Sequence, residues 1–287
     1  MSSIANADPY GDRPLVQPEL VDLNQINSAF YFSLALTPKT LPDTLIVAGD
    51  IGALTELNLW HSLAEAWRWP VELASSERTY KLLGSMIAPV DTALARLHQS
   101  SVLGVGYGMH IGSREQLWLE KALSSEDFEV AYVTAEIIPL FLHNTALLQS
   151  RNIIPVWSVA ECISLLKKLH VTVRSQPGRG LYNVAALLGA MPLQSDMICL
   201  YDAERIYMFV RSTGKMLHIP RDARLERSAL RTILSSMLML ICNSNRRSGS
   251  LEDCARATLQ LMASIRASQS ADDIARECRV NIERWAA

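Results

Sequence analysis

The sequence predicts an α+β fold, rich in helix, with a mixed N-terminal region that holds short strands, a central β-hairpin and a C-terminal helical bundle. Three observations support this class. Residues Thr44–Ala48 (TLIVA) are an apolar run that precedes a turn and a helical pattern. Residues Met197–Tyr201 and Arg205–Arg211 are strand-like runs joined by Asp202-Ala203-Glu204, which is typical of a hairpin. From Arg224 onward the apolar residues recur at helical spacing.

Four successive regions follow from these patterns, which suits a chain of 287 residues. In chain order we expect an N-terminal arm (1–20), an acidic mixed α/β region (21–150), an α+β region with the hairpin (151–220) and a basic helical bundle (221–287). The arm holds three prolines and shows no period. The bundle consists of three expected helices: Ala229–Cys242, Leu251–Ala267 and Ala271–Trp285.

The elements between these landmarks are less regular. Ala29–Ala35 reads as a strand or a buried helical turn. A helix is expected over Ala53–Trp67, where Pro70 follows its end. Ser113 and Gln116 have the spacing of a capping box and predict the start of a helix. Val159–Leu169 is expected to form another helix.

Charge is distributed unevenly along the chain. Residues 1–150 carry 8 Lys and Arg against 17 Asp and Glu, a net charge of −9, whereas residues 151–287 carry 19 against 12, a net of +7. Such asymmetry favours either nucleic-acid contact by the basic half or head-to-tail attraction between copies. A chance distribution of charge is the simpler alternative, and a GC-rich genome would also favour the arginines of the basic half.

The cysteines and the hydropathy indicate a reducing, soluble setting. The five cysteines are widely spaced and form no C-x-x-C pair, so a zinc or disulfide framework is not expected. The first 30 residues lack the apolar core of a signal peptide, and no window reaches 18 consecutive apolar residues. We therefore expect no membrane span and a location in a virion or a host cytoplasm.

The glycines of Gly104-Val-Gly-Tyr-Gly108, with Gly112, are the first candidates for phosphate binding. Their spacing is G-x-G-x-G and no G-K-[ST] follows, so a P-loop is excluded. Glycines that allow close packing of a strand are the simpler interpretation. Asp50 follows the TLIVA run and could be an acid at a strand tip, although a favourable charge near a helix N-terminus explains it as well.

No motif of catalysis or metal binding appears elsewhere. The six histidines include no pair at i,i+4, and no G-x-S-x-G is present. We therefore expect no catalytic residues, no metal, no cofactor and no enzymatic activity. An α/β enzyme with a site near Asp50 and Gly104–Gly112 remains one alternative, and a bacterial adaptor or interaction protein is another.

Aromatic residues and arginines supply the candidate contact sites. Trp60 and Trp67 share a helix face, with Trp69 close behind, which indicates either core or a partner interface. The arginine spacing predicts a helical stripe that contacts RNA phosphates or a partner, with solvated ion pairs as the alternative. The candidate arginines are Arg174, Arg179, Arg221, Arg224, Arg227, Arg231, Arg246 and Arg247.

These patterns together favour a non-enzymatic structural protein that self-assembles, similar in role to the shell or nucleocapsid protein of an RNA virus. Its complementary charged halves would bring copies together, and its N-terminal arm would pack on a neighbour. The expected partners are other copies of the chain or other shell proteins, and RNA through the arginines.

Overall fold

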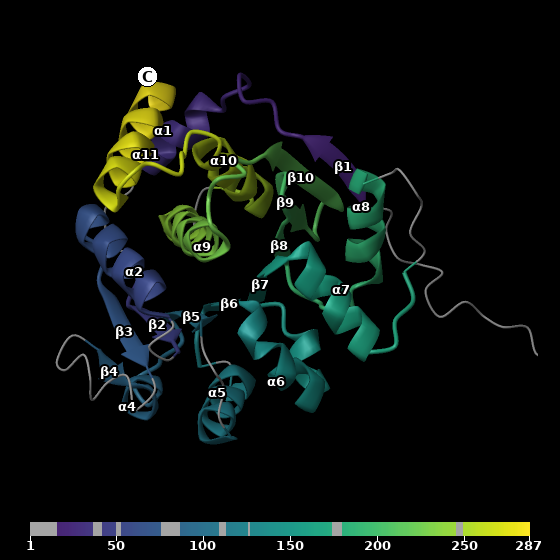
Figure 1. The fold of residues 1–287 in the computed structure, drawn as a ribbon. Helices are drawn as coiled ribbons and strands as arrows, with labels where there is room; N and C mark the ends of the chain where they lie inside the picture. The colour runs from purple at the N-terminus through teal and green to yellow at the C-terminus, as the bar shows by residue number, and fades with distance from the viewer. Residues whose placement is uncertain are drawn as a thin grey trace, which may run out of the picture.

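A ten-stranded sheet runs through the part of the chain that the structure describes (Figure 1). The structure is a computed structural model, and it describes residues 16–36, 42–49, 53–75, 87–108, 113–125, 127–173, 180–244 and 249–287. Its strands are β1 (Gln17–Leu20), β2 (Thr44–Ala48), β3 (Val71–Ser75), β4 (Ala88–Pro89), β5 (Val102–Tyr107), β6 (Val130–Val133), β7 (Ile153–Ser158), β8 (Met197–Tyr201), β9 (Arg205–Val210) and β10 (Lys215–Pro220).

The strand order across the sheet is β1-β10-β9-β8-β7-β6-β5-β2-β3-β4. Strands β2 to β8 are parallel to one another, and β9 is antiparallel to both β8 and β10. Residues of β2, β5 and β7 are buried along their whole length, as expected for parallel strands covered on both faces.

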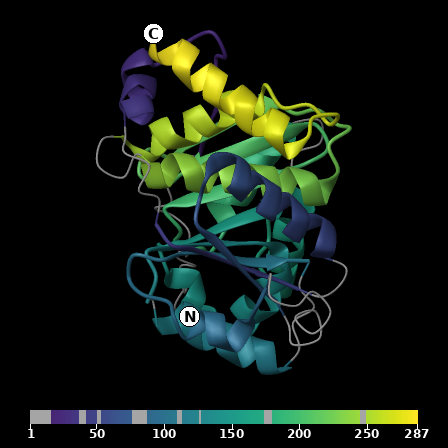
Figure 2. The ribbon, with the colours of Figure 1, turned by 90° about the vertical axis from the view of Figure 1, so that its left-hand side faces the viewer.

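Helices cover both faces of the sheet, so the molecule has three layers (Figure 2). One face is covered by α1 (Ser28–Leu36), α2 (Leu54–Trp67), α9 (Arg227–Ser244), α10 (Leu251–Met262) and α11 (Ala271–Ala286). The other is covered by α4 (Val90–Leu94), α5 (Ser113–Ser125), η3 (Ala135–Ile137), α6 (Ile138–His143), η4 (Thr145–Gln149), α7 (Val159–Lys168) and α8 (Gly180–Ala190). Each face therefore has its own apolar core.

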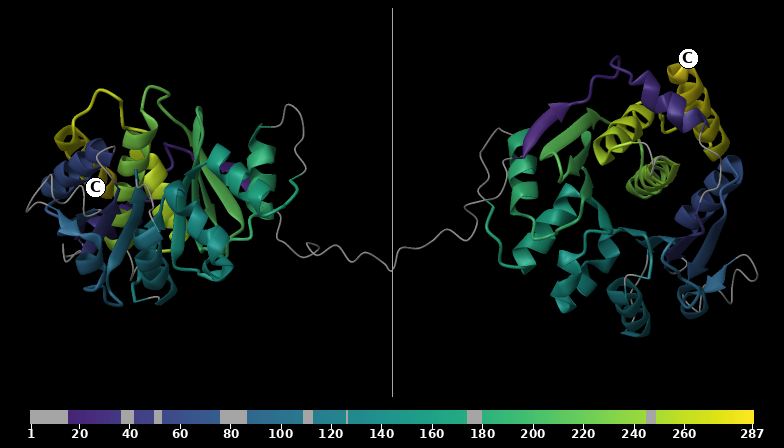
Figure 3. Two further views of the ribbon diagram at one scale, coloured as in Figure 1. Left: turned by 60° about the horizontal axis from the view of Figure 1, so that its bottom comes forward. Right: turned by 180° about the vertical axis from the view of Figure 1, so that it is seen from behind.

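Helix α9 lies in the centre of its layer. It is buried from Leu230 to Met239, and it packs on α2, α10 and the strands β5 and β7. Viewed from behind, α1 lies beside α11, so segments near the two ends of the chain meet (Figure 3). Helices α7, α10 and α11 each begin with a capping box, formed by Ser158 with Glu161, Ser250 with Asp253 and Ser270 with Asp273.

The predicted α+β class, rich in helix and with a central hairpin, is confirmed, and the sheet is larger than expected. The hairpin forms between β8 and β9, and the three expected C-terminal helices are present. Ala29–Ala35 belongs to a helix, α1, and not to a strand. The division of the chain into four regions stays a prediction. Residues 1–15 of the expected arm lie outside the described residues, and its end forms β1, which pairs with β10 of the same copy.

Several ion pairs join the acidic half of the chain to the basic half within one molecule. Arg231 binds Glu56 and Glu136, and both Lys215 and Arg256 bind Glu19. Each of these ion pairs joins a residue before position 150 to one after it. Part of the charge of the two halves is thus paired inside one copy, and the charges outside these pairs still leave the halves opposite in sign.

Every helix that the structure describes falls short of the length or the apolar character that crossing a membrane requires.

Candidate functional site

The sheet has a point at which its strand order reverses, between β2 and β5. From β2 the chain goes to β3 and β4 on one side, and then to β5, β6, β7 and β8 on the other. In open α/β sheets, ligands bind outside the carboxyl ends of the strands at such a point, because the two neighbouring connections run to opposite faces. The side chains around the carboxyl ends of β2, β5 and β6 are therefore the first candidates for a ligand site.

A buried cluster of three charged side chains lies there. The Arg231 guanidinium donates hydrogen bonds to Glu56 Oε1 from Nε (3.0 Å) and Nη2 (2.7 Å). Its Nη1 donates to Glu136 Oε1 (2.7 Å) and Oε2 (2.9 Å). Glu56 is 3% exposed and Arg231 is 8% exposed, whereas the Glu136 side chain is 25% exposed. Glu136 is thus the member of this charged cluster that solvent or a ligand can reach.

Three separate elements bring the charged cluster together. Glu56 is in the first turn of α2, which follows β2, one of the two strands at the reversal point. Glu136 is in η3, which follows β6, and its Oε2 accepts a hydrogen bond from Thr134 Oγ1 (2.6 Å). Arg231 is in the second turn of α9, which lies over the sheet. The charged cluster therefore fixes α9 to the carboxyl edge of the sheet.

Two glycines of the β5 end make room for these groups. Gly106 has a φ of +109°, and a Cβ there would lie 2.2 Å from Thr134 Oγ1. Gly108 has a φ of +65°, and a Cβ there would lie 2.8 Å from the Cβ of Ala53 and 3.0 Å from Glu56 Oε2. These positions need glycine both for backbone conformation and for space. The interpretation of these glycines as close-packing residues is confirmed, and phosphate binding is not required to explain them.

Burial and neighbouring charges shift the pKa values of Glu56 and Arg231. The pKa of Glu56 is raised, because burial disfavours its charged form and the Glu136 carboxylate adds repulsion, which Arg231 only partly offsets. Although burial opposes its charge, the pKa of Arg231 is raised by the two glutamates, so the guanidinium stays charged. A carboxyl group with a raised pKa beside a buried cation is found at functional sites and also in structural ion-pair networks.

Two buried hydroxyl groups extend the cluster inward. Tyr107 and Ser235 are fully buried, and neither hydroxyl makes a well-formed hydrogen bond within the described part of the chain. Burial raises the pKa of Tyr107, which the nearby Ser235 partly offsets. The Tyr107 ring packs edge-on against Trp60, with ring centroids 5.4 Å apart. A buried hydroxyl without a strong hydrogen bond costs stability, and other buried atoms of the described residues, such as Trp157 Nε1, are in the same situation.

Further polar groups continue along the edge toward β8. Tyr201 ends β8, and its pKa is raised by burial and by the charges of Glu161 and Glu136. Arg231 and Arg227 of α9 act in the opposite direction on the same hydroxyl. The carboxyl edge from β5 to β8 thus carries carboxylates, hydroxyls and two arginines within electrostatic range of one another.

The predicted arginines do not form a single helical stripe. Helix α9 begins at Arg227, so Arg221 and Arg224 precede it. Arg224 is exposed and pairs with Asp222, and Arg221 donates to the Leu225 carbonyl. Arg231 is buried in the charged cluster, so only Arg227 and Arg231 of the expected stripe belong to one helix, and only Arg227 of these two is exposed. Four of the predicted arginines lie outside the described residues: Arg174, Arg179, Arg246 and Arg247.

The tryptophans belong mainly to the core. Trp60 is fully buried and Trp69 is 4% exposed, while Trp67 is half-buried and packs against the same core. The rings of Trp60 and Trp69 therefore pack inside the molecule and present no surface to a partner. Asp50 and Gly112 of the alternative enzyme site lie outside the described residues.

Sequence reasoning missed Glu56 and Glu136. One signal was available for Glu56, since it lies four residues before Trp60 and seven before Leu63, on the buried face of its helix. A charged residue on an apolar face indicates a buried partner of opposite charge. No comparable signal marks Glu136, because η3 is a single short turn. Clusters of three or more metal-ligating side chains are absent from the ranges that the structure describes.

Fold and site together define a three-layer α/β protein with a charged cluster at the reversal point of its sheet, and this fold is similar to that of several solved structures. A ribokinase-like superfamily protein from Enterococcus faecalis has a TM-score of 0.61 and 9% identity, over 94% of this chain and 96% of that chain. A Bacillus subtilis member of the UPF0031 family has a TM-score of 0.56 and 14% identity, over 88% and 96%.

A third similar structure is an ADP/ATP-dependent NAD(P)H-hydrate dehydratase from Bacillus subtilis, crystallised with ATP/Mg²⁺. It has a TM-score of 0.54 and 13% identity, over 88% of this chain and 96% of that chain. At these identities the likeness concerns the fold. No protein-family model matches the sequence, and no curated protein matches it.

This fold corrects the expectation of a non-enzymatic shell protein of a virus. The prediction was wrong because it rested on the net charges of the two halves and on missing motifs, neither of which determines a fold. Nothing in a ribokinase-like fold indicates a capsid, a virion or self-assembly. The alternative of an α/β enzyme agrees better with the fold. Contact with other copies or with RNA stays a prediction.

Proposed function

We propose that the chain is an α/β enzyme that binds an adenine nucleotide and acts on a small molecule at the carboxyl edge of its sheet. The observation that carries the proposal is the charged cluster of Glu56, Arg231 and Glu136 at the point where the strand order reverses. Two of its three side chains are almost completely buried, and Glu136 alone is open to a ligand.

The nucleotide part of the proposal is supported by the similar structures. The dehydratase from Bacillus subtilis is ADP/ATP-dependent and was crystallised with ATP/Mg²⁺. In this chain the first turn of α9 carries no acidic residue, and Arg227 is exposed there. A helix N-terminus with an arginine attracts phosphate groups, because unpaired N–H groups and a positive charge lie together. We assign the phosphate contact to Arg227.

Within the charged cluster, the Glu136 side chain would act as a carboxylate that is already in position before a ligand binds. Glu56 and Thr134 hold Arg231 and Glu136 in one arrangement, so little reorganisation is needed when a ligand arrives. The Glu136 carboxylate then lies beside the ligand, held in place by Arg231 and Thr134. In that position it accepts a proton from, or a hydrogen bond donated by, the reacting molecule.

Nucleotide binding is tested by thermal unfolding with ATP, ADP and GTP, with and without Mg²⁺. An adenine nucleotide at about 100 times its Kd stabilises the folded chain by about 2.7 kcal/mol, which is easily detected. Arg227→Gln is expected to weaken ATP binding about tenfold, because one charge-assisted contact is lost. The matched control is Arg224→Gln, an exposed arginine on the preceding loop that pairs with Asp222. The nucleotide proposal is abandoned when no nucleotide shifts the unfolding temperature.

The role of the carboxylate is tested separately by basal ATP turnover. Glu136→Gln keeps the shape of the side chain and removes its charge, so turnover is expected to fall at least 100-fold. The control is Glu120→Gln, a similarly exposed carboxylate at 20% that pairs with His143 and not with Arg231. Equal activity in the two variants contradicts the assignment.

A further inference from the structure

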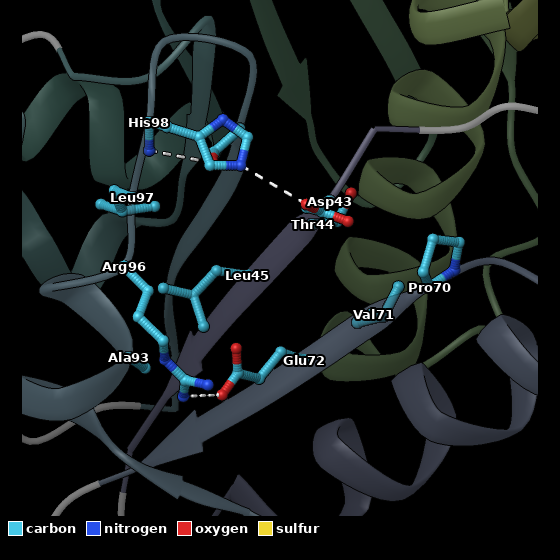
Figure 4. A pocket seen from close by; sticks show the side chains of 11 residues that line it. Asp43, Thr44, Leu45, Pro70, Val71, Glu72, Ala93, Arg96, Leu97 and His98 are labelled. Atoms are coloured by element: carbon cyan, nitrogen blue, oxygen red, sulfur yellow. Dashed lines mark hydrogen bonds and ion pairs between the residues drawn. The ribbon is translucent and has the colours of Figure 1, made fainter.

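An open pocket of about 460 Å³ lies at the amino ends of β2 and β3. Its ionisable side chains form pairs on either side of Leu45 (Figure 4). Arg96 pairs with Glu72, and His98 pairs with Asp43. Because these groups are exposed to solvent, the pocket selects no particular ligand. Two cysteines on the other face of the sheet support a more definite inference.

Cys242 and Cys254 lie side by side on α9 and α10, two helices that pack on each other. Cys242 is two residues before the end of α9 at Ser244, and Cys254 is three residues after the start of α10 at Leu251. A hydrogen bond joins the two thiols. A disulfide holds its sulfur atoms about 2.05 Å apart. Thiols in hydrogen-bonding contact reach that separation by side-chain rotation and a small shift of one helix.

The two sulfur atoms differ in their access to solvent. Cys254 is 3% exposed and belongs to the core on this face of the sheet, whereas Cys242 is half-buried at the border of that core. On the side of the sheet, the Tyr132 hydroxyl of β6 forms a hydrogen bond with Cys242. An oxidant in solution therefore meets Cys242 before it meets Cys254.

Hydrogen bonding to Cys242 and burial raise the pKa of Cys254 well above its usual value, so this thiol stays protonated at neutral pH. Burial also raises the pKa of Cys162, Cys199 and Cys278. Cys254 differs from these three because a second, more accessible sulfur lies in contact with it. Redox-sensitive cysteines often have this arrangement, in which an accessible sulfur is oxidised and a neighbouring one completes the disulfide.

We propose that Cys242 and Cys254 are a modification site, and that they form a reversible disulfide when the chain meets hydrogen peroxide. The Cys242 sulfur attacks the O–O bond and becomes a sulfenic acid, and one water is released. The Cys254 sulfur then displaces the hydroxyl group of the sulfenic acid. The S–S bond forms, and a second water leaves with the thiol proton of Cys254. Two thiols are thus oxidised, and one peroxide is reduced to two waters.

The disulfide would join the C-terminal end of α9 to the start of α10. Arg227 and Arg231 are at the opposite end of α9, so the bridge has no direct contact with the charged cluster. The inference therefore does not depend on the proposed function. Cross-linking a short loop restricts the unfolded chain, so the oxidised protein should unfold at a higher temperature than the reduced protein.

The proposal is tested by peptide mapping after the folded full chain has been treated with hydrogen peroxide. Trypsin cleaves after Arg246 and Arg247, which separates the two cysteines into the peptides 232–246 and 248–256. A disulfide joins these peptides into one species, whose mass is two hydrogens below their sum, and dithiothreitol releases them. We expect this species to be about ten times as abundant as any other cysteine pairing, because a disulfide tolerates only a narrow range of geometry.

Two variants form a matched pair, since both Cys254 and Cys278 are buried thiols. Cys254→Ser should leave Cys242 without a resolving sulfur, so that peroxide oxidises it to the sulfinic acid. Cys278→Ser should give the same yield of the linked peptides as the unaltered chain. Absence of the linked peptides from the oxidised, folded chain overturns the proposal, and so does a yield no greater than that of other cysteine pairings. Both results come from the unaltered chain, so they stand even where a variant fails to fold.

Discussion

Replacement of Arg231 by methionine gives the sharpest test of the charged cluster. The change keeps an apolar stem of similar length and removes the guanidinium that donates two hydrogen bonds to Glu56 and two to Glu136. Glu56 is then left as a buried carboxylate with no cation beside it. Breaking a buried ion pair by removing one partner costs about 3–5 kcal/mol, and we expect a loss of this size in the free energy of unfolding at pH 7.5.

The loss should depend on pH in a defined direction. The folded-state pKa of Glu56 is raised above its ordinary value of 4.5, and loss of Arg231 raises it further, because the guanidinium is what lowers it. A raised carboxyl pKa stabilises the folded state fully below pH 4.5, and that contribution disappears as the pH rises through the folded-state pKa. The Arg231→Met deficit should therefore grow as the pH rises above the folded-state pKa of Glu56 in the unaltered protein, by at most about 1.4 kcal/mol per pH unit, and level off above the higher pKa of the variant.

Urea unfolding followed by circular dichroism between pH 5 and 8 measures this deficit. Arg224→Met is the control, since that arginine is exposed and its pairing with Asp222 is solvated. In the double variant Arg231→Met with Glu56→Gln, most of the pH dependence should vanish, because the buried carboxyl is gone. A deficit below about 1 kcal/mol, or one that does not change with pH, refutes the argument that the pair is buried and coupled.

Four more predictions concern local structure. Gly106→Ala should destabilise the protein by more than about 2 kcal/mol in urea unfolding, because of its positive φ and the 2.2 Å contact of the new Cβ. In Gly189→Ala the new Cβ would lie 3.8 Å from its nearest neighbour, so helix α8 should gain up to about 1 kcal/mol of stability. A loss of stability in this variant contradicts the contrast between the open site at Gly189 and the crowded site at Gly106. Ser158→Ala removes a capping box and should cost about 1 kcal/mol, measured as a lower unfolding temperature; an unchanged value argues against the cap. Burial raises the pKa of Cys162 and Cys278 to about 12, so mass spectrometry should find both unmodified by iodoacetamide at pH 7.5 until denaturant is added; labelling of the folded chain contradicts their burial.

Local features of the fold could be predicted from the sequence, because neighbouring residues determine them. The hairpin was expected over Met197–Tyr201 and Arg205–Arg211, and the strands are β8 (Met197–Tyr201) and β9 (Arg205–Val210). The side chain of Asp202 accepts hydrogen bonds from the backbone of Glu204 and Arg205, which is the turn chemistry that its residue type suggests.

The charged cluster could not be predicted in the same way. The partners of Arg231 are 175 and 95 residues away in the chain, so no spacing in the sequence connects them. Counting charge by halves treats each half as a separate body. In a sheet whose strand order reverses, early and late segments become neighbours, and Glu56 of the acidic half meets Arg231 of the basic half.

The pairing of β1 with β10 has a consequence for biosynthesis. Gln17 lies opposite Lys215, and Glu19 binds Arg256, 237 residues further along. During translation β1 is synthesised long before β10, its partner strand. It therefore stays unpaired until most of the polypeptide has left the ribosome. Contacts of such long range are slow to form, and nascent chains halted before residue 215 should remain easily digested by proteases near β1.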